Sequence, residues 1–374
     1  MTFWRRWIKK PPATVTSRRA WRASKRALQD ALSMGNRDEI IKRTLEAAEI
    51  AEDEGDTDKM RKFSDALVRL EAYERAWEFY VLAVGSSQQS PICQWDGSDL
   101  AERSILVTYV PRNSIGEELR LSRFISPVAQ RARRCIVLAE PRLVPLLRRT
   151  FPGVDVHPRG ADDDAALAEV EFTAYYQTIA AHHARTADEM RRSFVPLLPD
   201  PSRVASIRQR YRSVSHGPLI GISWWSRTKR KDLPDLKDWA PLLRWNNASI
   251  VCLQHGDIES DVQVLEDLAS GRVIRDTEID QFADLDGFAA QIAALDGVVS
   301  ISNTTIDIAG MLGVPTVHLR DDKFSRTWPP SGPSSWYPGM AFLYRQHRPW
   351  SDVVAEATMH LERVALGNLQ HRHV

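Results

Sequence analysis

The sequence predicts an α/β protein with a helical region before two successive units of parallel sheet. Beyond residue 91, short apolar runs rich in β-branched residues alternate with segments of helical periodicity, which is typical of parallel sheets. Before that point the apolar residues recur at helical spacings. With 374 residues the chain is long enough for more than one hydrophobic core. We expect a basic segment at 1–30, a helical region at 31–90, and α/β units at 91–215 and 216–374.

The composition excludes several classes of protein. Lys and Arg number 50 against 49 Asp and Glu, so the net charge of +1 gives no overall field that favours nucleic acid. No apolar stretch approaches the roughly 18 residues of a membrane span, and the start lacks the apolar core of a signal peptide. The cysteines, Cys93, Cys135 and Cys252, are too far apart for a disulfide scaffold or a C-x-x-C site. We expect a cytoplasmic protein with reduced, buried thiols.

The first 26 residues carry nine Lys and Arg and no acidic residue. Four apolar residues, Phe3, Trp4, Trp7 and Ile8, are interleaved with the first basic ones. Such a segment can lie on an anionic membrane surface, where each basic residue contributes about 1 kcal/mol. A solvated terminus has the same composition. Peripheral contact with the inner face of a membrane is therefore one of two interpretations of residues 1–26.

Residues 17–85 have the apolar spacing of several helices, with helix ends predicted at 35–36 and 55–56, where Gly precedes Asn or Asp. Residues 70–80 have the small and aromatic spacing of a tetratricopeptide helix, although stable arrays need about three such repeats. Their aromatic side chains fit either a hydrophobic core or a peptide-binding face. The polar residues at 85–91 predict a linker.

Each apolar run in the rest of the chain is followed by a segment with helical period. A break near residues 211–218 separates two α/β units. Ligands of open parallel sheets bind beyond the carboxyl ends of the strands, so two facing units would enclose a cleft. The predicted strands are 105–110, 135–139, 219–224, 249–253, 297–301 and 315–319.

The turn after the first predicted strand supplies two carboxylates. Gly116 permits a tight turn into a helix, and Glu117 and Glu118 then fall in its first turn, where the macrodipole favours them. A carboxylate at the mouth of a cleft can accept a proton from an acceptor hydroxyl as a general base. The same two residues also fit a simple role as helix-start charge.

Two later turns could bind an anion. Residues 227–231 carry four cations in five positions after the strand at 219–224, which suits a diphosphate or a solvated basic loop. After the strand at 297–301, Asn303, Thr304 and Thr305 fall at the N-cap and first turn of an apolar helix. Free amides, hydroxyls and the positive dipole end make this an anion site in principle, although ordinary capping uses the same residues. Asp307, one turn further in, disfavours phosphate there.

Several common catalytic motifs are absent from the sequence. It contains no G-x-G-x-x-G, G-x-x-x-x-G-K-[ST], G-x-S-x-G or H-E-x-x-H pattern, which argues against dinucleotide dehydrogenases, P-loop NTPases, serine hydrolases and zincins. The ten histidines show no metal-ligand spacing beyond two surface-type pairs.

From about Gln94 to the end, the chain resembles the glycosyltransferase module of bacterial tetratricopeptide-repeat proteins. That module is similar to the ADP-heptose heptosyltransferases and more remotely to the O-GlcNAc transferases. The order and spacing of several short motifs carry the resemblance. These motifs are W-D-G at 95–97, G-E-E-L at 116–119, P-R-L-V-P-L at 141–146, F-P-G-V at 151–154, G-I-S-W at 221–224, L-Q-H-G-D at 253–257, I-A-A-L-D at 292–296, L-G-V-P at 312–315, W-Y-P at 336–338, and Phe342 with R-Q at 345–346.

The resemblance implies two facing Rossmann-like domains of the glycosyltransferase-B type after a tetratricopeptide-like helical region. It also implies a metal-independent, inverting transfer of a sugar from a nucleotide donor to a protein or glycan acceptor, with no cofactor. The family's catalytic aspartate falls on Glu117, and Glu118 is adjacent. The residues that the resemblance places at the donor are Trp224, Arg227, Lys231, Gln254, Gly256, Ser302, Asn303, Thr304 and Thr305.

This sequence departs from the family pattern at three places. Glu117 replaces aspartate, Ser302-Asn303 stands where many relatives carry Asp-Thr, and Asp307 stands where histidine is usual. A second hypothesis is therefore a catalytically silent relative that binds a partner protein through its helical region.

Overall fold

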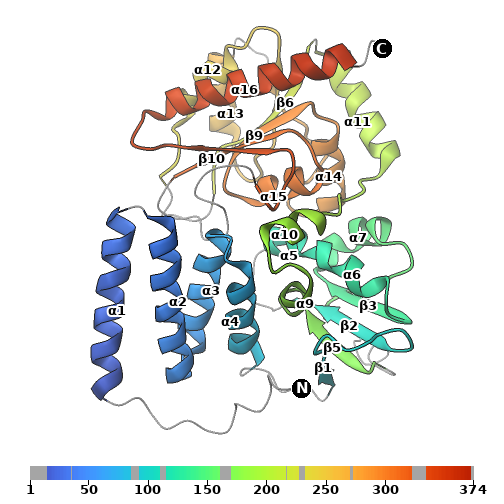
Figure 1. Ribbon diagram of the computed structural model, residues 1–374. Helices are drawn as coiled ribbons and strands as arrows, with labels where there is room; N and C mark the ends of the chain where they lie inside the picture. Colours follow the sequence, from blue (N-terminus) through green and yellow to red (C-terminus); the bar gives the residue numbers. More distant parts are fainter. Residues whose placement is uncertain are drawn as a thin grey trace. The chain divides into compact units, whose positions relative to one another are not determined.

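In the computed structural model the chain forms two compact units, a helical unit and an α/β unit (Figure 1). The helical unit contains Met1–Pro91 and also Gln177–Met190, while Ile92–Tyr176, Arg191–Ser325 and Ser331–Val374 form the α/β unit. Within the part of the chain that the structure describes, the helical unit is therefore assembled from stretches that are far apart in the sequence. The structure describes residues 15–34, 36–85, 92–109, 115–160, 170–215, 217–226, 232–269, 273–321 and 334–371.

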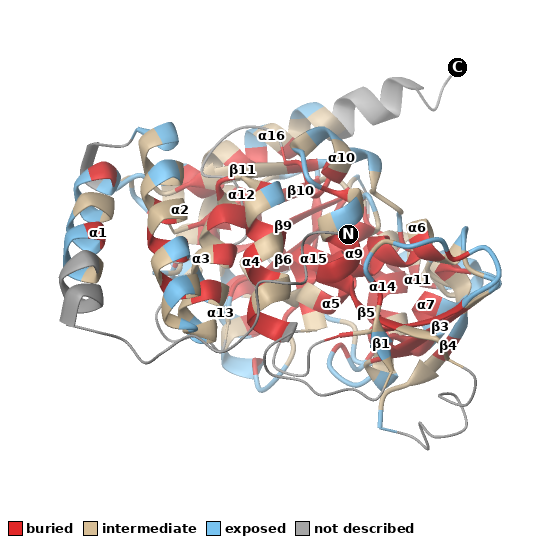
Figure 2. Cartoon of the chain, turned by 60° about the horizontal axis from the view of Figure 1, so that its bottom comes forward, coloured by how far each residue is buried: buried red, intermediate tan, exposed pale blue. Residues whose placement is uncertain are grey.

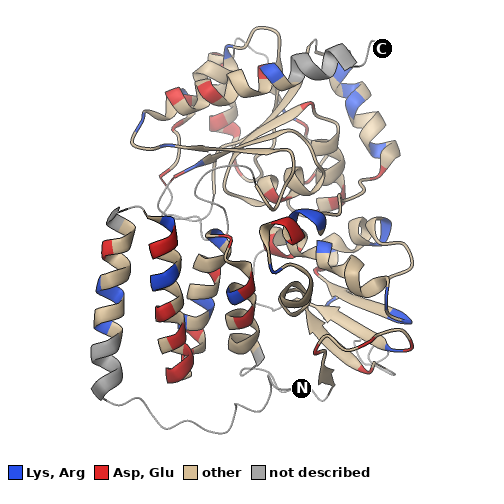
Figure 3. Ribbon diagram, viewed as in Figure 1, with Lys and Arg blue, Asp and Glu red and all other residues tan. Residues whose placement is uncertain are grey.

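The helical unit is built from short amphipathic helices with well-formed ends. Asn36 and Asp56 accept hydrogen bonds from the backbone amides of Glu39 and Lys59, and Gly55 ends the second helix at a φ of +70°. Charges of both signs lie along that helix, as Figure 3 shows, and form ion pairs within it. The helices are α1 (Val15–Met34), α2 (Arg37–Glu54), α3 (Thr57–Arg69) and α4 (Tyr73–Gly85), joined by parts of α9 (Tyr176–His183) and α10 (Ala187–Arg192).

The first half of the α/β unit contains a five-stranded parallel sheet in the order β1-β5-β2-β3-β4. Buried β-branched residues fill its central strands, as in Val107 opposite Val137. Its strands are β1 (Cys93–Gln94), β2 (Ser104–Thr108), β3 (Arg134–Ala139), β4 (Asp155–Pro158) and β5 (Phe172–Tyr175). Its helices are α5 (Ile115–Leu121), η2 (Ser122–Phe124), α6 (Ile125–Ala129), η3 (Pro141–Leu143) and α7 (Val144–Thr150).

The second half contains a six-stranded parallel sheet in the order β11-β10-β9-β6-β7-β8. It is introduced by α11 (Pro201–Ser213), which packs against α14 (Leu285–Ala293). Its strands are β6 (Leu219–Ser223), β7 (Ser249–Cys252), β8 (Val273–Ile274), β9 (Gly297–Ile301), β10 (Thr316–Arg320) and β11 (Met340–Tyr344). Its helices are η4 (Leu236–Trp239), α12 (Ala240–Leu243), α13 (Glu259–Leu268), α14 (Leu285–Ala293), α15 (Thr304–Met311) and α16 (Trp350–His371).

The central strands of the second half are buried (Figure 2), and their side chains belong to one apolar cluster. Ile220, Ile222 and Trp224 of the β6 segment share one apolar cluster with Val299 on β9 and Val353 on α16. The six strands predicted from the sequence correspond to β2, β3, β6, β7, β9 and β10. Because both faces of these strands are covered, every residue of β6, β7, β9 and β10 is buried.

One of the three cysteines differs from expectation. Cys93 is exposed, whereas Cys135 and Cys252 are the buried free thiols we predicted. Burial raises the pKa of the Cys252 thiol to about 11, so it stays protonated at neutral pH. Among the described helices, none combines the length and the apolar character that a bilayer crossing requires.

Candidate functional site

The carboxyl ends of β6, β7 and β9 are tied together by a network of amide and hydroxyl groups. The Gln254 Oε1, just beyond β7, accepts from the Ser223 hydroxyl at 3.0 Å and from the Trp225 amide at 2.9 Å. The Asn303 Nδ2, just beyond β9, donates to the same Ser223 Oγ at 2.7 Å and to the Trp225 carbonyl at 3.3 Å. Three strand ends are thereby fixed relative to one another at the edge where parallel sheets bind ligands.

Asn303 also forms the N-cap of α15. Its Oδ1 accepts from the Thr305 amide at 3.1 Å and from the Ser300 hydroxyl at 3.2 Å. Thr304, the first residue of the helix, is half-buried, and Thr305 is buried. The Ser302 hydroxyl lies 2.7 Å from the Nε2 of buried His318 on β10. This helix start therefore serves both as an ordinary cap and as a positively polarised group of amides and hydroxyls.

Asp307 is engaged in a buried ion pair between the two halves of the α/β unit. Its Oδ1 accepts from the Arg120 Nη1 on α5 at 3.3 Å and from the Tyr337 hydroxyl at 2.9 Å. A Cβ atom at Gly116 would lie 2.1 Å from the Asp307 Oδ2, so glycine is needed there for close approach. Asp307, one turn into α15, thus pairs with the Arg120 guanidinium.

The two glutamates of α5 lie in different surroundings. Glu118 is buried, and its carboxylate accepts from the Glu140 amide at 2.9 Å and from the Arg159 Nη2 at 2.5 Å. Burial raises the pKa of Glu118, and the Arg159 guanidinium opposes this rise. Glu117 is half-buried, and its Oε1 lies 3.9 Å from the Arg120 Nη2. Of the two carboxylates, Glu117 is the one that retains contact with solvent.

The two adjacent tryptophans after β6 also differ. Trp224, which we expected at the donor, is buried in the core cluster, and its indole N–H donates to Asp261 at 2.9 Å. Trp225 is 49% exposed, although the Gln254 and Asn303 side chains hold its backbone on both sides. Arg227 and Lys231, the expected cationic partners of a diphosphate, lie outside the described residues.

A cavity of about 320 Å³ opens beyond the ends of β7 and β8. Gln254 and Gly256, both predicted at the donor, line it together with Arg275 and Asp276. Gly256 has a φ of +106°, which an L side chain rarely adopts. The remaining lining residues are Cys252, His255, Ile258, Thr277, Ile279, Asp280 and Gln281.

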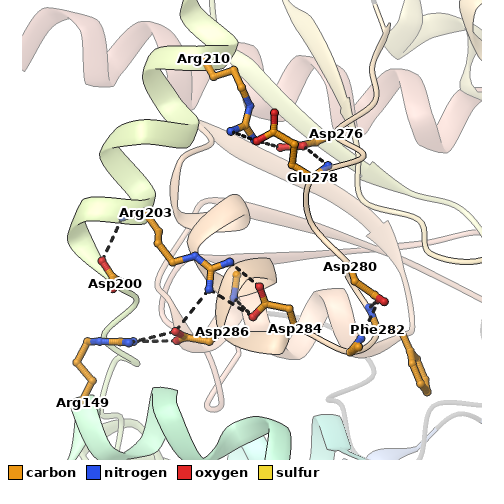
Figure 4. A network of polar contacts seen from close by, with 12 residues as sticks. Arg149, Asp200, Arg203, Arg210, Asp276, Glu278, Asp280, Phe282, Asp284 and Asp286 are labelled. Carbon is orange, nitrogen blue, oxygen red and sulfur yellow. Dashed lines mark hydrogen bonds and ion pairs between the residues drawn. The ribbon is translucent and has the colours of Figure 1, made fainter.

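A network of polar contacts orders the far wall of this cavity (Figure 4). Asp276 pairs with Arg210 and accepts from the Tyr211 hydroxyl at 2.7 Å. Asp280 accepts from the amides of Phe282 and Ala283, and these bonds lower its pKa. The acidic groups of the wall are therefore held in place by partners on α11 and by the backbone.

The same network connects the two halves of the α/β unit. Arg149 on α7 donates to both carboxylate oxygens of Asp286 on α14, at 2.8 and 3.1 Å (Figure 4). Arg142 donates to the Phe282 carbonyl at 2.8 Å, and its guanidinium lies 4.8 Å from the centroid of the Phe282 ring. The halves are thus joined by charged contacts on the cavity side as well as at Asp307.

Some of these residues were missed by the sequence analysis. His318 and Arg120 carry no local motif, and Tyr337 was noted only as part of W-Y-P, because each acts through a partner distant in the chain. Trp225 was also missed: every residue of β6 is buried, so an alternation of two does not separate Trp225 from the neighbouring Trp224. In the ranges that the structure describes, no three His, Cys, Asp or Glu side chains gather into a set of metal ligands.

Comparisons with known proteins place this geometry in context. No family model matches the sequence. The chain is 26% identical over 335 residues to protein FlbA of Caulobacter vibrioides, a match that covers 82% of this chain and 55% of FlbA. The chain thus spans about half the length of that relative.

Two solved structures show the same fold. A glycosyl transferase family 9 protein from Veillonella parvula matches with a TM-score of 0.54 and 13% identity, over 73% of this chain and 100% of that one. ADP-heptose LPS heptosyltransferase II from E. coli matches with a TM-score of 0.52 and 12% identity, over 71% of this chain and 99% of that one. These likenesses confirm the predicted α/β fold with parallel sheets, which is the fold of the two glycosyltransferase structures.

Proposed function

We propose that the protein is a metal-independent, inverting glycosyltransferase that moves a sugar from a nucleotide donor to a protein or glycan acceptor. The fold is shared with two glycosyltransferases of known structure, and the reaction is inferred from the chemistry of this chain's own residues. The observation that carries it is the direct link, through Gln254, Ser223 and Asn303, between a cavity and a helix N-terminus at one sheet edge.

The site has the two chemical features that a nucleotide donor requires. The cavity beside Gln254 and Gly256 is large enough for a nucleoside. The start of α15, with Asn303, Thr304 and Thr305, offers amides, hydroxyls and a positive dipole end to a diphosphate. Arg227 and Lys231 are the proposed cationic partners, and they take the role of a metal ion in neutralising the leaving group.

Glu117 is the proposed general base. The acceptor oxygen attacks the anomeric carbon, its proton passes to the Glu117 carboxylate, and the bond from carbon to the diphosphate oxygen breaks with its electron pair on that oxygen. A single displacement of this kind inverts the anomeric centre. The half-buried position of Glu117 supports this role better than the buried pairing of Glu118 with Arg159 does.

Nucleotide binding provides the first test. The melting temperature of the full chain is measured with ADP-, UDP-, GDP- and CMP-sugars, in buffer with EDTA. A sugar nucleotide at 100 times its dissociation constant is expected to add about 2.7 kcal/mol to the free energy of unfolding. If no nucleotide raises the transition, the silent, partner-binding hypothesis replaces the enzymatic one. A rise that needs a divalent cation would instead refute metal independence.

We also propose that residues 1–26 contact an anionic membrane surface. The support is their nine basic residues without an acidic one. Deleting residues 1–10 should reduce pelleting with phosphatidylserine vesicles but leave pelleting with neutral vesicles unchanged. Equal pelleting of the deletion variant and the full chain would remove this proposal.

A further inference from the structure

Trp225 is an exposed aromatic side chain on a fixed backbone. Of the tryptophans in the described ranges, it is the one in the exposed class, since the others are buried or half-buried. Its amide donates to Gln254 and its carbonyl accepts from Asn303. The two hydrogen bonds fix the backbone of Trp225, and its indole, 49% exposed, offers an aromatic face for contact with a ligand.

The position of Trp225 relates it to both parts of the proposed donor site. In the sheet, β6 lies between β7 and β9. Trp225 follows β6, the cavity-lining Gln254 follows β7, and the helix cap Asn303 follows β9. Trp225 does not itself line the cavity, but its backbone is bonded to Gln254, which does, and to Asn303, which caps α15.

We propose that the Trp225 indole is the platform on which the nucleoside of the donor stacks. This inference rests on the proposed function, since it assumes a nucleoside diphosphate in the site. The planar, weakly polar face of the nucleobase can stack on an indole face, whereas a charged pyrophosphate group cannot stack on it. Trp225 thus distinguishes nucleoside diphosphates from inorganic pyrophosphate, and Trp224, buried in the core, has no part in binding.

Calorimetric titration of the full chain with ADP, UDP, GDP and inorganic pyrophosphate tests the assignment. Stacking of a base on an aromatic side chain is worth about 1–3 kcal/mol, so Trp225→Ala is expected to weaken the preferred nucleoside diphosphate by about 5- to 150-fold. Pyrophosphate affinity should be unchanged, and Trp225→Phe should restore most of the loss. Met359→Ala, at a residue of α16 that is 48% exposed, serves as the matched control.

The outcomes separate the two proposals. If the wild-type chain binds no nucleotide, the proposed function fails. If it binds nucleotides and Trp225→Ala leaves their affinity unchanged, or weakens pyrophosphate to the same extent, the stacking role is overturned while the proposed function stands. Quenching of tryptophan fluorescence by acrylamide gives a second measurement. The nucleotide should reduce quenching in the wild type and should not do so in Trp225→Phe, which lacks this indole. Quenching of the wild type that the nucleotide does not change would contradict stacking.

Discussion

At the residue scale, neighbouring side chains of similar chemistry have separate roles. The sequence offers Glu117 and the adjacent Glu118 as candidate catalytic carboxylates, and it places Trp224, the neighbour of Trp225, at the donor. In the structure one member of each pair is buried against a specific partner, Arg159 or Asp261. Sequence patterns do not separate the two members of a pair, because the partners that distinguish them, Arg159 and Asp261, lie 41 and 37 positions away in the chain.

Glu117→Gln and Glu118→Gln are expected to differ in which property they change. Glu117→Gln should preserve donor affinity and slow transfer by about 10²–10⁴-fold, since a general base contributes about that much. Glu118→Gln should chiefly lower the melting temperature, because it leaves the Arg159 guanidinium without its charged partner. Release of nucleoside diphosphate and thermal unfolding are measured on both variants. An equal kinetic loss in the two would show that the base has been assigned to the wrong carboxylate.

At the element scale, the capping residue predicts where α15 starts, but no sequence signal predicts the contact between α15 and α5. Asn303 at the N-cap is a local signal. The ion pair between Arg120 and Asp307 joins residues 187 positions apart, and no periodicity reports such a contact. Asp307, which the sequence suggested would repel phosphate, has instead a buried partner on the other half of the α/β unit.

Asp307 should make stability depend on pH in an unusual direction. Burial raises its pKa to about 6 despite the Arg120 guanidinium, whereas an unfolded Asp titrates near about 3.9. The folded chain therefore holds this proton to higher pH, so unfolding releases it between about pH 4 and 6. The free energy of unfolding contributed by Asp307 is expected to fall as pH rises through that window and to level off above it.

This contribution is measured by urea unfolding at pH 4.5, 5.5 and 7. It is the difference between the free energies of unfolding of the wild type and of Asp307→Asn at each pH. Asp280→Asn is the control, because backbone hydrogen bonds lower the pKa of Asp280 and its contribution is lost only as pH falls below about 4. Its difference from the wild type should be flat over the same range. Parallel curves for the wild type and Asp307→Asn would contradict the expected titration.

At the scale of the whole molecule, the sequence predicts the α/β class and the six well-buried strands, but not the composition of the helical unit. The linker at 85–91 suggested that the helical region is a separate N-terminal segment. In the structure that unit also takes in Gln177–Met190, which lies after the fifth strand. The Trp77 indole N–H on α4 donates to the Ala184 carbonyl at 2.8 Å. Such a long-range addition follows from tertiary packing and leaves no boundary signal in the sequence.

A fragment of residues 92–374 is therefore expected to be less stable than the full chain. It retains Gln177–Met190 but lacks the helices of the same unit, so the Ala184 carbonyl loses Trp77, Arg185 loses Glu74, and we expect buried apolar residues of this segment to become exposed. Dye binding to exposed apolar surface should rise, and the melting temperature should fall. Trp77→Ala in the full chain should destabilise by about 3–5 kcal/mol, because it opens a cavity at a buried aromatic position, whereas Trp77→Phe should cost less. A monomeric fragment that melts at the temperature of the full chain, without added dye binding, would show that Gln177–Met190 does not depend on the N-terminal helices.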